Sequence, residues 1–191
     1  MLKEERKKYS KFLSLILRHH PEVANLTLDS HGWADIDNLL INLNITKADL
    51  IEIVENDSKG RYIISKDGKS IRANYGHSID VNLNLKITNP PLYLYHGTSI
   101  DNIDSIMEKG ILSMQRQYVH LSQNYDTALK VGLRHGEAIV LKISAQEMVH
   151  NGMEFFKSEN GIYLTKYVPN NYITVLENAK LKIKQKKLWK K

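Results

Sequence analysis

Apolar residues in the first ninety positions recur mostly at the three- and four-residue spacing of amphipathic helices. This spacing predicts helices over 9–19 and 35–43. It predicts a third helix opening at Thr46-Lys47-Ala48-Asp49, which resembles a capping box. The residues of the first and third helices expected to face the core are Phe12, Leu13, Ile16, Leu17, Leu50, Ile51 and Val54.

Short runs of β-forming residues lie between and after these helices. Residues 26–28 are a strand candidate closed by a turn around Gly32. Residues 61–65 and 70–74 flank Lys66-Asp67-Gly68-Lys69, a strong hairpin-turn signal. A helix, a strand, two helices and a hairpin in this order predict a winged helix. Winged-helix domains commonly bind nucleic acid, but a fold alone does not establish function.

Paired prolines at Asn89-Pro90-Pro91 interrupt the pattern and favour an extended linker. After them, short apolar runs alternate with helical segments, which predicts an α+β lobe with mostly short strands. Strands are expected at 92–95, 118–121, 138–143, 162–165, 172–176 and 181–183, and helices at 101–109 and 125–133. The predicted parts are thus 1–88, a linker at 89–91, a second lobe at 92–179 and a basic tail at 180–191.

Composition narrows the class of protein. A chain of 191 residues with 42% hydrophobic content can form one large or two small cores. The absence of cysteine excludes disulfides, thiolate metal sites and a cysteine nucleophile. The start of the sequence is charged, and no apolar run approaches the roughly 20 residues of a membrane helix. We therefore expect a cytoplasmic protein without a membrane partner.

The net charge of +6 is concentrated at one end. Seven lysines and no acids lie in 180–191, so residues 1–179 carry a net charge of −1. Any nucleic-acid contact made by the body would then use a few placed cations instead of a general positive field. The tail fits either salt-sensitive attraction to phosphates or a solvated end that aids solubility.

Common metal and nucleotide motifs are missing. The eight histidines form no HExxH or paired Cys/His pattern, so no metal site is expected. There is no GxGxxG after a strand and no Walker loop, so a dinucleotide would not bind through a Rossmann turn or a P-loop.

Taken singly, the other polar signals have ordinary alternatives. Arg18 and His19 end a helix, where cations compensate the helix dipole, and Arg61 at a strand edge could be solvated. Gly97 allows a ligand close to the backbone but also suits an ordinary turn. His120 could be a hydrogen-bonded core residue.

The ordered combination of these signals resembles the KptA family of NAD-dependent RNA 2′-phosphotransferases. The motifs that carry the resemblance are Ser10-Lys11-Phe12-Leu13-Ser14-Leu15-Ile16-Leu17-Arg18-His19, Gly32-Trp33, Asn56-Asp57, Arg61-Tyr62, Gly76-His77-Ser78, His96-Gly97-Thr98, Val119-His120-Leu121-Ser122, Arg134-His135-Gly136 and Asn160-Gly161. They extend from about Ser10 to about Tyr172, so the basic tail lies outside them. Tyr75 departs from the glutamine that the family commonly has before Gly-His-Ser.

The resemblance implies a winged-helix lobe that holds RNA, followed by a lobe with the ADP-ribosyltransferase fold that holds NAD. Carried over by motif, the catalytic residues are Arg18, His19, Arg61 and Arg116. His96 and His120 match the first two positions of the NAD-binding signature of that fold. The complete set expected to bind NAD is His96, Gly97, Thr98, His120, Leu121, Ser122 and Asn160.

The third position of that signature is apolar in this family, where protein-modifying relatives usually have glutamate. Here the strand begins Ala138-Ile139-Val140-Leu141, and Glu137 lies just outside it. A carboxylate helps to deprotonate or orient an acceptor, whereas an RNA 2′-phosphate is largely dianionic near neutral pH and needs cations. The substitution therefore favours a phosphate acceptor.

The implied reaction consumes NAD in two steps. The RNA 2′-phosphate attacks C1″ of the nicotinamide ribose and expels nicotinamide. The ribose 2″-hydroxyl then attacks that phosphorus, which releases RNA with a 2′-hydroxyl and ADP-ribose 1″,2″-cyclic phosphate. The partners implied are NAD and a 2′-phosphorylated RNA, with tRNA from splicing as one candidate, and the resemblance favours a monomer.

Two other readings stay open on the sequence. An ADP-ribosyltransferase acting on a terminal nucleic-acid phosphate or on a protein would stop after the first step. A non-catalytic winged-helix RNA-binding module would have a degenerate second lobe. The presence of all four candidate catalytic residues argues against the second reading, because a pure binder has no evident need for the set.

Overall fold

A computed structural model describes residues 1–176 of the chain. Its contacts divide these residues into two compact units. The first, here the N-terminal unit, consists of Met1–Leu85, Gln115–Gln117 and Ser158–Asn160, and the remaining residues form the C-terminal unit. The predicted strand at 181–183 and the basic tail at 180–191 lie outside the described residues.

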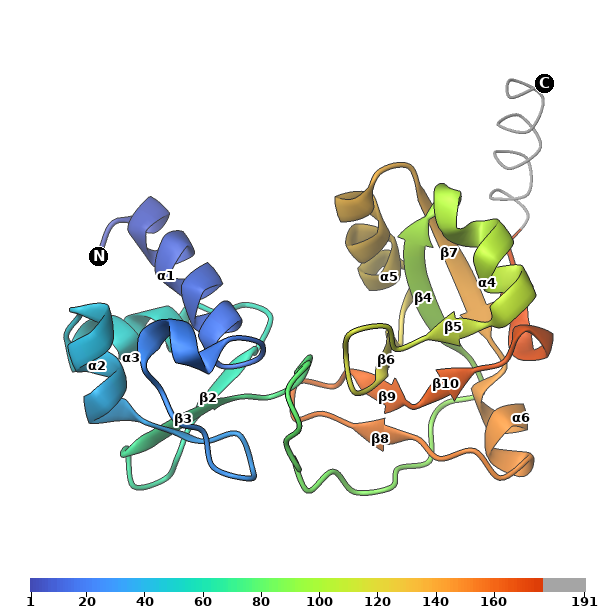
Figure 1. The fold of residues 1–191 in the computed structure, drawn as a ribbon. Helices are drawn as coiled ribbons and strands as arrows, with labels where there is room; N and C mark the ends of the chain where they lie inside the picture. Colours follow the sequence, from blue (N-terminus) through green and yellow to red (C-terminus); the bar gives the residue numbers. More distant parts are fainter. Residues whose placement is uncertain (177–191) are drawn as a thin grey trace. The chain divides into compact units, whose positions relative to one another are not determined.

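Three α-helices and a short 3₁₀ turn pack together in the N-terminal unit (Figure 1). They are α1 (Lys3–Ile16), a 3₁₀ turn η1 (Pro21–Ala24), α2 (Ile36–Leu43) and α3 (Lys47–Glu55). The first helix begins six residues before the predicted start, because its charged first turn is also suited to a helix. Glu4 and Glu5 lie there, where carboxylates favour the positive end of the helix dipole, and the Glu5 carboxylate accepts a hydrogen bond from the Leu2 amide.

The capping box at Thr46 is confirmed. The Thr46 hydroxyl accepts a hydrogen bond from the Asp49 amide at 3.1 Å, and the Asp49 carboxylate accepts one from the Thr46 amide at 3.0 Å. The predicted core face of α3 is partly wrong. Ile51 is 38% exposed and Ile53 is buried in its place, while Leu50 is fully buried as predicted.

A three-stranded antiparallel sheet completes this unit, in the order β1 (Ala34–Asp35), β3 (Ser70–Ala73), β2 (Tyr62–Ile64). The predicted hairpin between β2 and β3 is present, and Gly68 adopts the positive φ that its turn requires. The expected strand at 26–28 is reduced to one isolated bridge between Leu28 and Ala34. Ile71 of β3 packs into the same apolar core as α1, α2 and α3.

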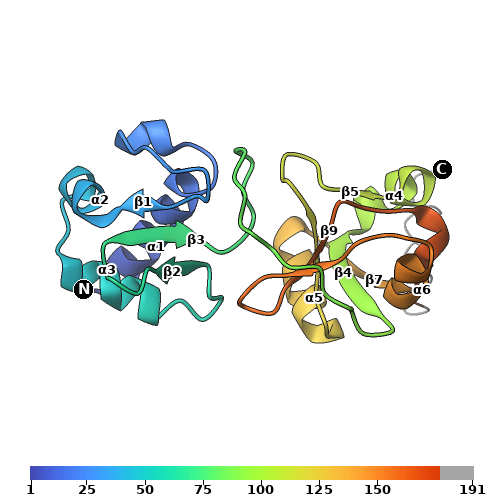
Figure 2. The same cartoon turned by 90° about the horizontal axis from the view of Figure 1, so that it is seen from below.

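Two small sheets form the C-terminal unit (Figure 2). One has the order β11 (Ile173–Val175), β7 (Ala138–Ile143), β4 (Leu94–Ser99), and the other β6 (Val119–Leu121), β9 (Tyr163–Thr165), β8 (Phe156–Lys157). A further pair joins β5 (Ile111–Leu112) to β10 (Tyr167–Val168), and the helices are α4 (Ile103–Lys109), α5 (Tyr125–Gly132) and α6 (Ala145–His150). Strands β5, β8 and β10 and helix α6 had not been predicted. The mixed α+β class is compatible with this arrangement.

Strands β4 and β6 meet at a single point. Tyr95 and Ser122 exchange two backbone hydrogen bonds of 2.8 Å in an isolated antiparallel bridge, and no further ladder is present between these strands in the described residues. The backbones of the two sheets pair at this bridge, and side chains from both sheets pack into one apolar core. None of the helices in the described part of the chain has the length and apolar character needed to cross a lipid bilayer.

Helix α5 packs directly on the backbone of β4. A Cβ atom at Gly97 would lie 1.7 Å from the carbonyl oxygen of Ala128. A glycine is thus required at this position by the packing of α5 alone.

Replacing Gly97 with alanine should therefore displace α5 and lower the free energy of unfolding by roughly 3 kcal/mol or more. Thermal and urea unfolding of the whole chain measure the change. The exposed Lys130→Ala substitution on the same helix is the control and should change the stability little. A Gly97→Ala protein as stable as the parent would contradict the packing.

Candidate functional site

The structure places all four predicted catalytic residues in the N-terminal unit. Arg18 and His19 follow α1, Arg61 precedes β2, and the exposed Arg116 belongs to the segment Gln115–Gln117. Burial lowers the pKa of His19, and the charges of Arg18 and Arg116 lower it further. Burial also lowers the pKa of Arg18, and the charge of Arg61 adds to this effect. The three arginines and His19 therefore lie close enough for their charges to interact, and we call this group the cation cluster.

Arg18 is the most buried member of this cluster. Its side chain is 8% exposed, and Nε and Nη2 have no hydrogen-bond partner among the described residues. The guanidinium carbon lies 4.7 Å from the centre of the Tyr75 ring. On another side, a Cβ atom at Gly76 would lie 3.4 Å from Nη1 of Arg18, and Gly76 has a φ of +87°. The guanidinium is thus enclosed by an aromatic ring and by bare backbone.

Ser78 fixes the turn that carries Arg18 and His19. Its amide donates a 2.9 Å hydrogen bond to the Arg18 carbonyl, and its hydroxyl lies 2.9 Å from Nδ1 of His19. The second contact orients the imidazole and leaves Nε2 as the ring nitrogen available to a substrate. The segment Tyr75–Ser78 therefore holds both residues in place.

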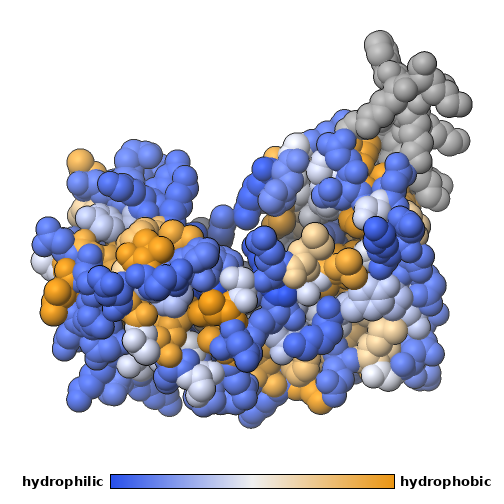
Figure 3. Space-filling model, in the orientation of Figure 1, coloured by the Kyte–Doolittle hydropathy of each residue, from blue (hydrophilic) through white to orange (hydrophobic). Residues whose placement is uncertain are grey.

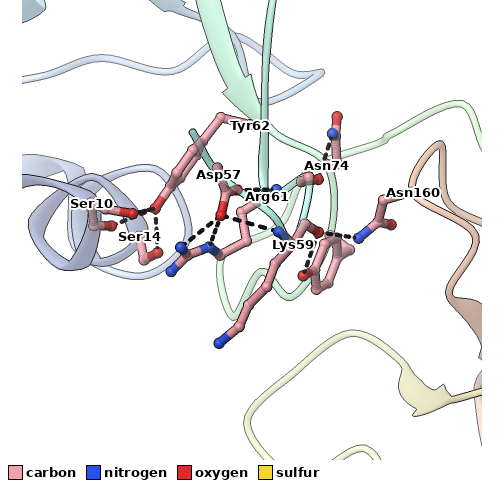
Figure 4. A network of polar contacts seen from close by, with 10 residues as sticks. Ser10, Ser14, Asp57, Lys59, Arg61, Tyr62, Asn74 and Asn160 are labelled. Atoms are coloured by element: carbon pink, nitrogen blue, oxygen red, sulfur yellow. Dashed lines mark hydrogen bonds and ion pairs between the residues drawn. The ribbon is translucent and has the colours of Figure 1, made fainter. Parts of the chain in front are cut away.

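Asp57 positions Arg61 (Figure 4). Its carboxylate is 1% exposed and accepts hydrogen bonds from Nε and Nη2 of Arg61 at 2.9 and 2.7 Å, and also from the Arg61 amide. Burial lowers the pKa of Arg61, but the hydrogen bonds and charge of Asp57 help to raise it overall. Arg61 is consequently a fixed cation held by a buried carboxylate, and its Nη1 edge makes no hydrogen bond to the described residues.

Two further contacts connect the parts of this unit (Figure 4). The Tyr62 hydroxyl lies 2.6 Å from the Ser14 hydroxyl and donates to the Ser10 carbonyl, which ties β2 to α1. The Asn160 amide donates a 2.7 Å hydrogen bond to the Lys59 carbonyl. Asn160, predicted to bind NAD, thus lies with the N-terminal unit.

His77 adds a neutral imidazole to this region. It is 1% exposed, and neither ring nitrogen has a hydrogen-bond partner in the described part of the chain. Burial lowers its pKa to about 4, and the charges of Arg18, His19 and Arg72 contribute. The side chain is therefore uncharged at neutral pH, so it adds no net charge to the positive cluster.

Sequence reasoning did not assign roles to Asp57, His77 or Ser78, although all three lie in the motifs that carry the family resemblance, and it did not predict the contact of Tyr75 with Arg18. The spacing of Asp57 four residues before Arg61 was the one signal that could have indicated the ion pair.

The predicted NAD-binding histidines lie in the C-terminal unit, next to the bridge between β4 and β6. Nδ1 of His96 lies 3.2 Å from the His120 carbonyl oxygen. Because a carbonyl oxygen only accepts, Nδ1 carries the proton and Nε2 is an acceptor. Burial lowers the pKa of His96, so the ring is neutral at physiological pH.

The neighbours of these histidines have packing roles in the structure. Gly97 faces α5, and Thr98 is buried with its hydroxyl accepting a 3.0 Å hydrogen bond from the Asn102 amide group. Leu121 lies in the core, and Ser122 pairs with Tyr95 through its backbone. No group of three or more histidine, aspartate or glutamate side chains suited to a metal ion occurs among residues 1–176.

The chain has an α+β fold and groups three arginines and a histidine in one unit. Arginine side chains grouped in this way are typical of proteins that bind phosphate groups. Its sequence agrees with a known family. Residues 4–167 match the family described as "RNA 2′-phosphotransferase, Tpt1 / KptA family", and the chain belongs to this family.

Similar proteins occur in distant bacteria. The chain is 45% identical over 179 residues to a "Probable RNA 2′-phosphotransferase" of Acaryochloris marina, covering 91% of this chain and 99% of the relative. A protein of the same name from Hahella chejuensis is 44% identical over 178 residues, covering 91% and 96%. Another from Pseudomonas fluorescens is 46% identical over 173 residues, covering 87% and 95%.

The buried His77 should make stability depend on pH. Its pKa is about 4 in the folded protein, against about 6.5 when unfolded. Protons therefore bind the unfolded chain first as the pH falls from about 6.5 to about 4, and the free energy of unfolding drops by up to about 3 kcal/mol from this residue.

In a His77→Leu variant, the free energy of unfolding measured in urea should fall less than in the parent between about pH 7 and about pH 4.5, because the contribution of His77 is absent. The exposed His135→Gln variant is the control and should keep the full drop. Equal slopes in His77→Leu and the parent would show that His77 titrates normally.

Proposed function

We propose that this protein removes an internal 2′-phosphate from RNA and transfers it to NAD, giving RNA with a 2′-hydroxyl, nicotinamide and ADP-ribose 1″,2″-cyclic phosphate. Family membership supports the RNA 2′-phosphotransferase activity. The observation that carries the proposal is the cation cluster, in which Arg18 is buried with Nε and Nη2 unpaired among the described residues.

A phosphate dianion is the ligand that suits this cluster best. Buried donors without partners are costly, and arginines bind phosphate oxygens through planar, paired N–H groups. Asp57 is the carboxylate in contact with Arg61, and it is neutralised by that contact. Glu137 lies outside β7, and the strand itself supplies only apolar side chains at its start. These features favour a phosphate acceptor over one that needs a general base.

Arg18 and Arg61 are assigned to the oxygens of the 2′-phosphate. In this proposal both guanidinium groups donate to the phosphate as it attacks C1″ of NAD, and nicotinamide leaves. His19, oriented by Ser78, holds the same phosphate through Nε2 or protonates the departing 2′-oxygen. Arg116, exposed on its loop, stabilises the phosphate when the ribose 2″-hydroxyl attacks it.

NAD is assigned to the C-terminal unit, beside His96 and His120. The polar groups here suit a dinucleotide, because Nε2 of His96 can accept a hydrogen bond from a ribose hydroxyl. Tyr95, next to His96, and Tyr125, five residues after His120, form an aromatic pair with ring centres 6.4 Å apart. We also assign the two lobes predicted from sequence, 1–88 as a winged helix for RNA and 92–179 as an ADP-ribosyltransferase fold. The element order of each unit supports this assignment.

The direct test is to incubate the protein with NAD and a short oligonucleotide bearing one internal 2′-phosphate. Loss of that phosphate, with release of nicotinamide and ADP-ribose cyclic phosphate, is the expected result by mass spectrometry. Stable ADP-ribosylated RNA would instead identify a transferase that stops after the first step. If NAD is not consumed, the enzymatic proposal fails.

Arg116→Ala should lower kcat by roughly a hundredfold, because one donor to the transition-state charge is lost. The phospho-ADP-ribosylated RNA should accumulate, since Arg116 is assigned to the second step. Gln115→Ala, a neighbouring exposed and uncharged position, is the matched control and should keep the parent rate. Normal turnover by Arg116→Ala would contradict the assignment.

A further inference from the structure

Helix α1 has a second face that the core does not use. Leu13 and Ile16 are fully buried against the other helices, whereas Leu15 is 37% exposed and Phe12 is only partly buried. Lys8, Lys11, Phe12 and Leu15 follow the three- and four-residue spacing that places side chains on one side of a helix. This outer face therefore combines lysines with apolar side chains.

An open groove of about 640 Å³ runs along this face. Its lining consists of Glu4, Lys7, Lys8, Tyr9, Lys11, Phe12, Leu15, Asn42 and Leu43. Apolar surface (orange) is exposed in the region of α1 and is bordered by hydrophilic residues (Figure 3). We call this feature the α1 groove.

The charge of the helix points to an anionic occupant. Residues 3–16 contain five cations and two carboxylates, whereas residues 21–55 contain one lysine and seven carboxylates. Arg6 is neutralised by Glu52 at 2.7 Å, and Lys7 lies 3.9 Å from Glu4. Lys8 and Lys11 make no ion pair with the described residues. Two lysines without an ion pair to the described residues, Lys8 and Lys11, thus line the groove.

The groove also lies on the helix that leads to the cation cluster. Lys11 precedes Arg18 by seven residues, or about 10 Å at the rise of an α-helix, and Lys8 by about 15 Å. An RNA strand whose 2′-phosphate is held at Arg18 could reach these lysines with nucleotides only a few positions away. Single strands bind through phosphates on cations and bases on apolar or aromatic side chains, and the groove offers both.

We propose that the α1 groove binds the single-stranded RNA that flanks the 2′-phosphate, with Lys8 and Lys11 on its phosphates and Phe12 and Leu15 under a base. The identity of the ligand rests on the proposed function. The groove thereby gives the protein affinity for RNA that does not depend on the 2′-phosphate itself.

Binding is tested without NAD and without a 2′-phosphate, by fluorescence anisotropy with a labelled single-stranded RNA of about twelve nucleotides. The variant Lys8→Ala with Lys11→Ala should weaken binding and lower the slope of log K against log salt by about 1.4, or about 0.7 per phosphate contact. Leu15→Ala should weaken binding with the slope unchanged, because it removes only apolar contact.

The matched control is Lys109→Ala with Lys130→Ala, which makes the same change of charge on two helices of the C-terminal unit. All variants keep residues 180–191, so the charge of that segment is constant. Equal slopes in the two double variants would overturn the proposal, as would unchanged affinity in Lys8→Ala with Lys11→Ala. Alanine favours helix, and circular dichroism verifies that α1 is retained.

A second measurement separates this proposal from the enzymatic one. With NAD present, the groove variant should raise KM for a long 2′-phosphorylated RNA but leave kcat and KM for a 2′-phosphorylated dinucleotide unchanged. An equal rise in KM for both substrates would refute the groove as a flanking site. If no substrate is turned over, the proposed function fails, but the binding measurement still shows whether the α1 groove binds RNA.

Discussion

The burial of Arg18 is the constraint around which the N-terminal unit is organised. Arg18 is 8% exposed as a residue, and two of its guanidinium nitrogens are buried without a hydrogen-bond partner among the described residues, which makes the burial of this charge costly. The ring of Tyr75 at 4.7 Å offsets some of this cost through a cation–π contact of up to about 2 kcal/mol. An anion that accepts hydrogen bonds from the guanidinium would offset more of this cost.

Other contacts of the unit hold Arg18 and its neighbours in place, so that Arg18 stays buried. Ser78 anchors the backbone of Arg18, Asp57 holds Arg61, and Tyr62 joins β2 to α1. Each contact fixes a backbone or side chain without placing a carboxylate against Arg18. These contacts hold the cluster in the arrangement that we propose binds the 2′-phosphate, and the neutral state of His77 avoids adding another positive charge.

Local signals predicted the parts of the fold that local interactions determine. The capping box at Thr46 and the hairpin around Gly68 are examples, because their hydrogen bonds lie within a few residues. Burial of Ile53 instead of Ile51 depends on which neighbours α3 packs against, and the two-residue strands β5 and β10 form only because distant segments pair. Sequence motifs identified Arg116 as a candidate, but they could not predict that it packs with residues 1–85, because this depends on long-range tertiary contacts. The catalytic and NAD-binding roles themselves stay predictions.

The N-terminal unit is built from three separate stretches of chain, and this has a consequence for its synthesis. Its first 85 residues are synthesised before Gln115–Gln117 and Ser158–Asn160. At a usual elongation rate, about 4 to 15 s pass between the synthesis of residue 85 and that of residue 160. Arg18 and Arg61 are synthesised before Arg116, which is added within this interval, and Asn160 is added only at its end. The cation cluster is therefore completed only when most of the protein has been translated, and a nascent chain cannot present it early.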